Sequence, residues 1–208
     1  MLAEQIGNID PADSKGRKRL RILEAAGELF ATQGYRKTNV GEIARKAGIA
    51  KGTVYLYFKT KVDILVAVLS LEKIKSFAAF ASVFDDAVPA NQRLHKWVEQ
   101  TLLITANSPL FSQLLAGDED MEAVFSDIDP KLLTQRDKAR GWMRDLLHQL
   151  APNHELDQLN ARVDVLSSLA YLAPHLRAPH ARHGVPLKDF AKILADIIVT
   201  GIQKEGES

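Results

Sequence analysis

Apolar residues recur every three or four positions along almost the whole chain. This period is typical of helices that bury one face, and no stretch shows the period-two alternation of a half-buried strand. Residues that start or stop helices, such as Gly34, Pro89 and Pro186, stand between the periodic stretches. The pattern predicts helices over residues 15–33, 61–84, 91–106, 109–126, 130–150, 155–173 and 187–203. The chain is therefore predicted to be all-α.

Residues 39–58, NVGEIARKAGIAKGTVYLYF, predict two short helices joined by a tight turn. Asn39 followed by Glu42 is a capping-box pair that starts the first helix, and Gly48 stands where the chain must reverse in a left-handed conformation. The positions that would press two helices together at a steep angle are all uncharged; they are Ile43, Ala44, Ala47, Ile49, Val54 and Tyr57. This set favours a DNA-binding helix-turn-helix over a generic αα-hairpin, which shares the turn.

The second of these helices has two distinct faces. Lys51 and Tyr55 are four residues apart and share one face, whereas Val54 and Phe58 share the opposite, inward face. Gly52, near the start of the helix, permits close approach of the backbone to a partner, and the unpaired N–H groups there favour phosphate. The sequence therefore predicts a helix that presents its outer face to duplex DNA.

Charge is distributed unevenly along the chain. Residues 14–61 hold 12 Lys or Arg against 3 acidic residues, whereas residues 62–208 hold 15 basic and 20 acidic residues. The net charge of +1 for the whole chain hides this difference. A basic first quarter suits a polyanionic partner. Four of these cations are expected to supply diffuse attraction rather than base recognition, namely Arg36, Lys37, Arg45 and Lys46.

The stretch from Gly34 to Lys61, with Thr38 and Asn39 followed by IARKAG and KGTVYLYF, resembles the DNA-binding domain of the TetR family of bacterial transcriptional regulators. The resemblance implies an N-terminal three-helix domain that contains the helix-turn-helix, followed by a larger helical domain for ligand binding, regulation and dimerisation. These domains are expected over residues 16–76, with the motif at 39–58, and over residues 77–208.

The resemblance also implies roles for single residues. In the family, residues that match Thr38, Tyr55 and Lys61 hold DNA phosphates, and residues that match Lys51–Thr53 and Tyr57 lie at the groove. The predicted DNA-binding residues are Thr38, Asn39, Lys51, Gly52, Thr53, Tyr55, Tyr57 and Lys61. Tyr57 could instead pack between helices. Ala50 departs from the Ser or Thr common in the family, so the second helix lacks a cap worth about 1 kcal/mol.

Two apolar stripes near the C-terminus suggest self-association. They run through residues 155–173 and 187–203, and their members are Leu156, Leu159, Val163, Leu166, Leu169, Ala173, Phe190, Leu194, Ile197 and Gly201. The stripes could close the core of a single chain or form a twofold four-helix bundle. The resemblance to TetR regulators implies the bundle, and hence a homodimer whose two heads match a palindromic operator in double-stranded DNA.

The resemblance further implies a pocket in the helical body for a small molecule that releases the operator. Large, adaptable side chains of this body are the candidate ligand contacts, although such side chains more often fill a core. They are Phe77, Phe80, Trp97, Phe111, Met121, Trp142, Met143 and Tyr171. The ligand is therefore expected to be apolar or amphipathic, and residues 61–84 are expected to transmit its binding.

Other classes of function find little support in the sequence. Motifs for nucleophilic, metal-dependent or phosphate-transfer catalysis are absent, so we predict no enzyme and no cofactor. His175, His180 and His183 lie close in sequence, but Pro174 and Pro179 interrupt the helical spacing that would preorganise a metal site, so none is predicted. A chain without cysteine or a membrane-spanning apolar run fits a cytoplasmic protein. The first 13 residues are expected to be a disordered lead-in.

The predicted function is sequence-specific DNA binding by a transcriptional regulator, most specifically a homodimeric repressor that its ligand releases. The alternative is a DNA-binding architectural or protein-partnered regulator without a small-molecule inducer. The first requires strong preference for one operator, whereas the second requires mostly salt-dependent, sequence-tolerant binding.

Overall fold

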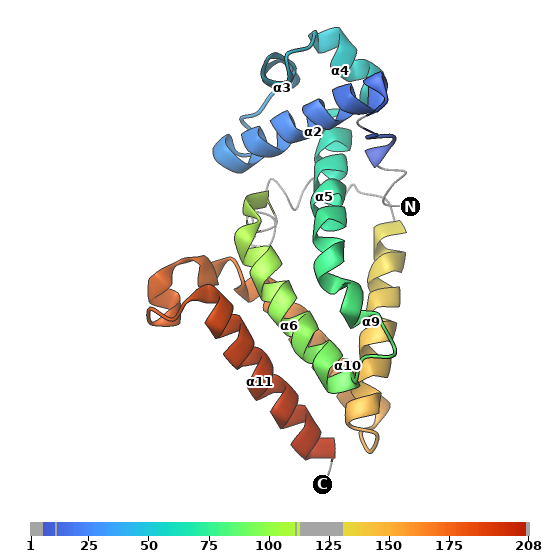
Figure 1. Cartoon of the computed structure of the whole chain (residues 1–208), viewed down its shortest axis with the longest axis vertical. Helices are drawn as coiled ribbons and strands as arrows, with labels where there is room; N and C mark the ends of the chain where they lie inside the picture. The colour runs from blue at the N-terminus through green and yellow to red at the C-terminus, as the bar shows by residue number, and fades with distance from the viewer. Residues whose placement is uncertain (1–5, 11, 111, 113–130, 207–208) are drawn as a thin grey trace. The chain divides into compact units, whose positions relative to one another are not determined.

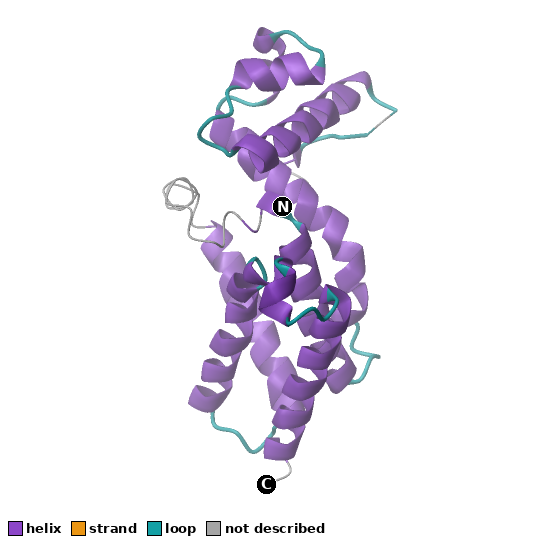
Figure 2. Ribbon diagram, turned by 90° about the vertical axis from the view of Figure 1, so that its left-hand side faces the viewer, coloured by secondary structure: helices purple, strands orange, loops and turns teal. Residues whose placement is uncertain are grey.

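The computed structural model describes residues 6–10, 12–110, 112 and 131–206. Every regular element in these residues is a helix, which confirms the predicted all-α class (Figure 2). The described residues fall into two compact units, a first unit that ends at Ala78 and a second unit that begins at Ala79. Within the described residues, no helix combines the length and the hydropathy needed to cross a membrane.

The described part of the first unit consists of α2 (Ser14–Gln33), α3 (Val40–Ala47), α4 (Lys51–Tyr57) and α5 (Lys61–Phe77) (Figure 1). Asp13 starts α2 by accepting hydrogen bonds from the backbone N–H groups of Lys15 and Gly16. α2 packs against α3 and α5 and buries Ile22 and Phe30 completely. The predicted helix over residues 15–33 and the predicted pair of short helices after it are therefore confirmed.

Residues before α2 are ordered on the first unit, so the expected disordered lead-in is wrong for residues 6–10, 12 and 13. The side chain of Ile6 is buried, and its carbonyl oxygen accepts a hydrogen bond of 2.9 Å from Arg19 of α2. The Asn8 side chain accepts a hydrogen bond from the backbone N–H of Asp10. One buried side chain and a few local hydrogen bonds hold this segment, and neither leaves a periodic pattern in the sequence.

The long helix predicted over residues 61–84 is shorter than expected. α5 ends at Phe77, and the chain continues as the 3₁₀ helix η1 (Ala78–Val83). No Gly or Pro signals this change. The tighter winding buries Val83 completely and presents its carbonyl oxygen to the side chain of Arg93, which donates a hydrogen bond of 2.9 Å from Nε. A tertiary contact therefore ends the helix where the local sequence would have allowed it to continue.

The described part of the second unit contains, after η1, α6 (Ala90–Asn107), α9 (Lys131–Leu150), α10 (Leu156–Leu172) and α11 (Leu187–Gly206). Two short 3₁₀ helices, η2 (His175–Arg177) and η3 (Pro179–Arg182), connect α10 to α11. These bounds confirm the predicted helices over residues 91–106, 130–150, 155–173 and 187–203. The predicted helix over residues 109–126 lies mostly outside the described residues.

α11 lies along α6 for most of its length (Figure 1). Its buried residues are small or β-branched for most of the contact: Ala191, Ala195 and Val199 follow one another at four-residue intervals, and Ile202 completes the row. Small side chains let two helix backbones approach closely. The sequence analysis missed this row because alanine carries little weight in an apolar pattern.

The two C-terminal apolar stripes differ in how far the structure buries them. On α10, the stripe represented by Val163, Leu166 and Leu169 is buried in the core of its own chain. On α11, Ile197 is 63% exposed, on the side of the helix opposite the buried alanine row. The stripe on α10 therefore closes the core of a single chain, whereas the stripe on α11 is covered only in part: Phe190 and Leu194 are half-buried, and Ile197 and Gly201 are exposed.

We expect Ala195→Leu to destabilise the second unit by about 1–3 kcal/mol, because the added atoms must fit between α11 and α6. Both tryptophans of the chain, Trp97 and Trp142, lie in this unit, so urea unfolding followed by tryptophan fluorescence reports its stability. Ala87→Leu in an exposed loop is the matched control and should change the free energy of unfolding by less than about 0.5 kcal/mol. Equal stability of the two variants would contradict the close packing.

Candidate functional site

α3 and its turn have the geometry that the sequence predicts. Asn39 accepts a hydrogen bond from the backbone N–H of Glu42, and the Glu42 side chain accepts one in return from the Asn39 N–H. Gly48 has φ +64°, in the left-handed region, and Arg21 of α2 hydrogen bonds to the carbonyl oxygen of Ala47 beside it. Both ends of α3 are therefore fixed, and the turn delivers the chain to α4 in a defined direction.

α4 shows a sharp division between an inner and an outer face. Val54 is fully buried and Phe58 is 4% exposed, whereas Tyr55 is 46% exposed. Lys51 and Gly52 are also exposed. The predicted orientation of the helix is therefore confirmed: the outer face carries a cation, a bare backbone and an aromatic hydroxyl, which can contact phosphates and base edges.

Leu56 is the residue of α4 that the sequence analysis missed. Its side chain is 83% exposed, the largest exposed fraction among the exposed large apolar side chains in the described part of the chain. It lies four residues after Gly52, on the side of the helix opposite Val54. An apolar side chain held in this position can contact the methyl group of a thymine in the major groove. The sequence could have revealed this residue, because Leu56 is a large apolar side chain on the face of the helix that was predicted to point toward DNA.

Thr38 and Lys61 lie where the loop before α3 meets the start of α5. Thr38 is 1% exposed, and its hydroxyl donates a hydrogen bond of 2.8 Å to the carbonyl oxygen of Gly34. Nζ of Lys61 donates to the carbonyl oxygens of Tyr35 and Thr38 and lies 4.1 Å from the centroid of the Tyr35 ring. Burial lowers the pKa of Lys61 and raises the pKa of Tyr35. Both predicted phosphate contacts thus have internal partners in this structure, and their roles toward DNA stay predictions.

The other predicted DNA-binding residues sit around α4. Asn39 is exposed at the start of α3, and Thr53 is half-buried at the start of α4. Tyr57 is also half-buried, and the guanidinium carbon of Arg19 lies 5.5 Å from the centroid of its ring. This contact fits the alternative in which Tyr57 packs within the first unit. As the sequence indicates, Ala50 provides no side-chain hydrogen bond to the start of α4.

A cavity of about 770 Å³ lies in the second unit between α6, α9 and α10. Four of the eight predicted ligand contacts line it, namely Trp97, Trp142, Met143 and Tyr171. Phe80 is half-buried elsewhere, Phe111 and Met121 lie outside the described residues, and so does the side chain of Phe77. The lining residues that the sequence analysis missed include an aromatic ring, Phe84, and an ion pair, Arg140 and Asp164.

Four aromatic side chains line this cavity, and the ion pair of Arg140 and Asp164 forms its charged edge. The rings of Phe84 and Trp142 pack with their centroids 4.9 Å apart. Arg140 donates a hydrogen bond to Asp164, and this bond raises the pKa of Arg140. An apolar chain could lie against the rings while an anionic group meets Arg140.

Arg93 connects this cavity to the segment that follows α5. Its side chain is buried, donates to the carbonyl oxygen of Val83 and forms a 2.8 Å ion pair with Asp86. The guanidinium carbon also lies 5.8 Å from the centroid of the Trp142 ring, which lines the cavity. The side chain of Arg93 therefore contacts both Trp142 and the backbone at Val83, so a displacement of Trp142 can alter the position of Val83.

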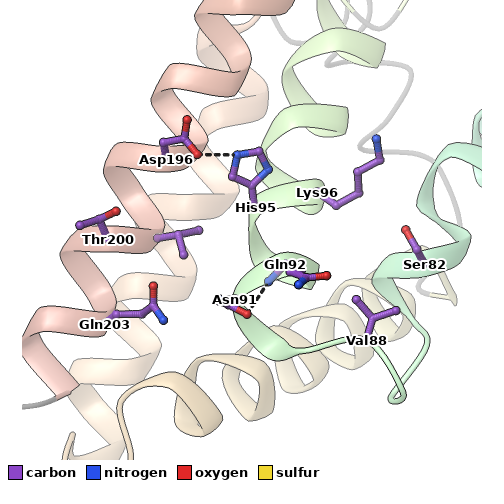
Figure 3. A pocket seen from close by; sticks show the side chains of 10 residues that line it. Ser82, Val88, Asn91, Gln92, His95, Lys96, Asp196, Thr200 and Gln203 are labelled. Carbon is purple, nitrogen blue, oxygen red and sulfur yellow. Dashed lines mark hydrogen bonds and ion pairs between the residues drawn. The ribbon is translucent and has the colours of Figure 1, made fainter.

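A second hollow of about 560 Å³ lies between α6 and α11, and its lining is largely polar (Figure 3). His95 Nε2 stands 3.0 Å from an oxygen of Asp196 across it, and Gln92 and Gln203 lie at its other end. None of the predicted ligand contacts lines this hollow. In the described part of the chain, no three His, Cys, Asp or Glu side chains gather closely enough to hold a metal ion.

Comparison with known proteins places these features in a family. Residues 22–68 match the family described as "Bacterial regulatory proteins, tetR family". The fatty acid metabolism regulator protein of Bacillus subtilis (strain 168) is 46% identical over 110 residues, which cover 53% of this chain and 52% of that protein. The chain thus spans about half the length of this relative.

Two solved structures share the fold over most of the chain. The structure of the regulator FadR from Bacillus subtilis in complex with stearoyl-CoA has a TM-score of 0.63 at 16% identity and covers 88% of this chain and 98% of its own. The structure of AibR in complex with isovaleryl coenzyme A and operator DNA has a TM-score of 0.64 at 17% identity, with coverages of 87% and 97%. At these identities the likeness shows a common fold and nothing more.

We expect Ala50→Ser to stabilise the start of α4, because a serine hydroxyl can accept a hydrogen bond from an N–H group that now has no side-chain cap. Hydrogen exchange of the Gly52 and Thr53 amides should slow about fivefold, as a cap worth about 1 kcal/mol requires. Ala50→Gly is the control without a hydroxyl and should not slow exchange. Equal protection in both variants would show that the missing cap costs the helix nothing.

Proposed function

Because the chain belongs to the TetR family of bacterial transcriptional regulators, we propose that it is a homodimeric repressor that binds a palindromic operator and leaves it when an amphipathic ligand binds. The observation that carries the proposal is the outer face of α4, where Lys51, Gly52, Tyr55 and Leu56 are all exposed. The role is non-catalytic, and since bacterial DNA lies in the cytoplasm, the protein would act there.

The first unit would act as the DNA-reading head. α4 enters the major groove, where Leu56 meets a thymine methyl group and Tyr55 and Lys51 reach the flanking phosphates. Asn39 is exposed at the start of α3 and keeps its side-chain amide N–H groups available for a phosphate while its oxygen caps the helix. Lys61 and Thr38 would shape the loop before α3, and Lys61 has a third N–H to offer to a phosphate.

The apolar outer sides of α10 and α11 support the homodimer. Val165 and Leu172 of α10 and Ile193 and Ile197 of α11 are between 52% and 69% exposed. On α11 this apolar side lies opposite the buried alanine row, so the helix is apolar on two opposite faces. A helix of this kind is stable when a partner covers its second face. Two α10–α11 pairs would form the four-helix bundle, and two heads would then match a palindrome.

The aromatic cavity of the second unit supports an amphipathic ligand. Stearoyl-CoA and isovaleryl coenzyme A, which FadR and AibR hold in their structures, combine an acyl chain with an anionic head. The cavity offers the same two chemistries, since Trp97, Trp142 and Phe84 suit an acyl chain and Arg140 suits an anion. We therefore place an acyl-CoA first among ligand classes for this chain.

Release of the operator requires that the ligand bind one arrangement of the protein better than the other. Phe84 and Trp142 line the cavity, and Arg93 ties Trp142 to Val83 at the end of η1, directly after α5. An acyl chain that displaces the Trp142 ring would disturb the contact of Arg93 with Trp142, and with it the hydrogen bond that holds Val83. In this way occupancy of the cavity would bias the position of the helix that leads from the head.

The proposed function is tested by selecting bound sequences from random DNA and comparing affinities at one fixed salt concentration. We expect the selected operator to bind about 10³-fold more tightly than random DNA, and stearoyl-CoA to abolish this preference. Binding of similar strength to all sequences, with a steep salt dependence, would instead support the architectural alternative. If the chain prefers its operator strongly and no acyl-CoA changes that preference, the repressor role stands and acyl-CoA is excluded as the ligand class.

We expect Arg140→Gln to weaken the binding of stearoyl-CoA about three- to tenfold, because the variant loses one charge-assisted contact. Trp97 and Trp142 both line the cavity, so quenching of their fluorescence measures the affinity. Lys138→Gln is the control, since Lys138 is an exposed cation two residues away that does not line the cavity. If both variants bind like the unchanged chain, Arg140 does not hold the anionic group.

We expect Ile197→Glu to convert the dimer into a monomer, because a carboxylate in an apolar helix interface cannot be solvated. Sedimentation velocity at micromolar concentration measures the change, and operator binding should weaken in parallel. Lys192→Glu, on the same helix but outside the apolar stripe, should remain dimeric. A dimer that survives Ile197→Glu would place the interface elsewhere.

A further inference from the structure

The C-terminal end of α4 is held by a contact that no part of the helix-turn-helix itself provides. α4 has only seven residues, lacks a side-chain cap at its start and buries a single residue, Val54. Helices this short depend on tertiary contacts for their position. The guanidinium carbon of Arg19, on α2, lies 5.5 Å from the centroid of the Tyr57 ring and 4.9 Å from that of Phe58. Both distances fit cation–π contacts.

Arg19 is itself oriented by the segment before α2. Its NH1 group donates a 2.9 Å hydrogen bond to the carbonyl oxygen of Ile6, whose side chain is only 1% exposed. Gly7 has φ +68°, and a Cβ atom there would lie 2.6 Å from NH1 of Arg19. A larger residue at position 7 would therefore strain the left-handed backbone and displace the guanidinium group of Arg19.

The segment is in turn fixed to the start of α2. Asn8 accepts a hydrogen bond from the N–H of Asp10, Asp10 accepts one from the N–H of Ala12, and Asp13 caps α2. These local bonds leave the Ile6 carbonyl at a set distance from α2. A continuous path of contacts therefore runs from the start of α2 through Ile6 and Arg19 to Tyr57, the last residue of α4, and to Phe58, which follows it.

We propose that residues 6–10, 12 and 13, together with Arg19, form a clasp that sets the angle of α4 and thereby contributes to the choice of operator without touching DNA. The clasp joins the described residues of this segment to the end of the helix that reads the groove. Arg19 is a positioning residue, because it acts through Tyr57 and Phe58. The inference rests on the proposed function, since it requires that α4 read the operator.

Charge separates positioning from direct attraction to DNA. Residues 2–9 contain one acidic residue, Glu4, and no Lys or Arg. Removing them takes away no cation that could hold a phosphate, and on electrostatic grounds it should strengthen DNA binding slightly. The clasp requires the opposite sign, namely weaker binding to the operator with unchanged binding to random DNA.

The test compares the full chain with a variant that lacks residues 2–9 and with Gly7→Ala, using the selected operator and random DNA. We expect both variants to lose about five- to tenfold in operator affinity, as the loss of one oriented cation–π contact predicts, while affinity for random DNA and its salt slope stay unchanged. Circular dichroism at the temperature of the binding assay verifies that each variant is folded.

Arg19 variants complete the test. Arg19→Lys keeps a cation and a donor near Ile6 and should recover most of the selectivity, whereas Arg19→Ala should not. Lys18→Ala removes a neighbouring exposed cation and controls for charge. Combining Arg19→Ala with the deletion should add little to the loss from Arg19→Ala, because both changes break the same path.

Three results would overturn the clasp. If the deletion variant keeps the operator preference of the full chain, the segment does not position α4. If the deletion weakens binding to operator and random DNA equally, its effect is a general loss of the head rather than of selectivity. If the full chain itself shows no operator preference, the proposed function fails first and the clasp fails with it.

Discussion

The burial of Val54 and Phe58 fixes which side of α4 faces outward, and the proposed contacts of this helix with DNA depend on that choice. Were the helix rotated by half a turn, Leu56 would enter the core and Val54 would face outward in its place. The capping box of Asn39 and Glu42 and the left-handed Gly48 fix the direction from which the chain enters α4. Burial of Val54 and Phe58 thus stabilises the position of α4, and the backbone geometry at Gly48 sets the direction of the helix.

In the second unit, burial of one helix face again decides which residues face outward. α11 buries a row of small residues against α6, and on its opposite side Ile193 and Ile197 remain exposed. One helix can therefore close the core of its own chain and also offer a surface to a second copy. The aromatic cavity between α6, α9 and α10 lies in this unit, with Arg93 linking its Trp142 wall to the residues just after α5. The proposed ligand site and the proposed dimer surface thus lie on the same set of helices, and the segment that follows α5 packs against one of them through Arg93.

Sequence reasoning succeeded where local chemistry decides the structure. The capping box at Asn39, the turn at Gly48 and the inward pair on α4 each follow from residue type and spacing. It failed where distant residues decide: Arg93 draws Val83 inward and ends α5 early, and Ile6 anchors a segment that looks disordered in isolation. It also overlooked Leu56 and the alanines of α11, because an apolar pattern gives weight to large side chains and assumes that they point inward.

Comparison of methyl and amide nuclear magnetic resonance signals of the chain with and without its operator tests the central claim most directly. The account predicts that the largest changes occur at the Leu56 methyl groups and at the amides of Lys51 to Leu56, and that the Val54 methyl groups, which are buried, change little. It also predicts a contact between the Leu56 methyl groups and a thymine methyl group. Operator binding that leaves the outer face of α4 unchanged, with the main changes on other helices, would contradict it.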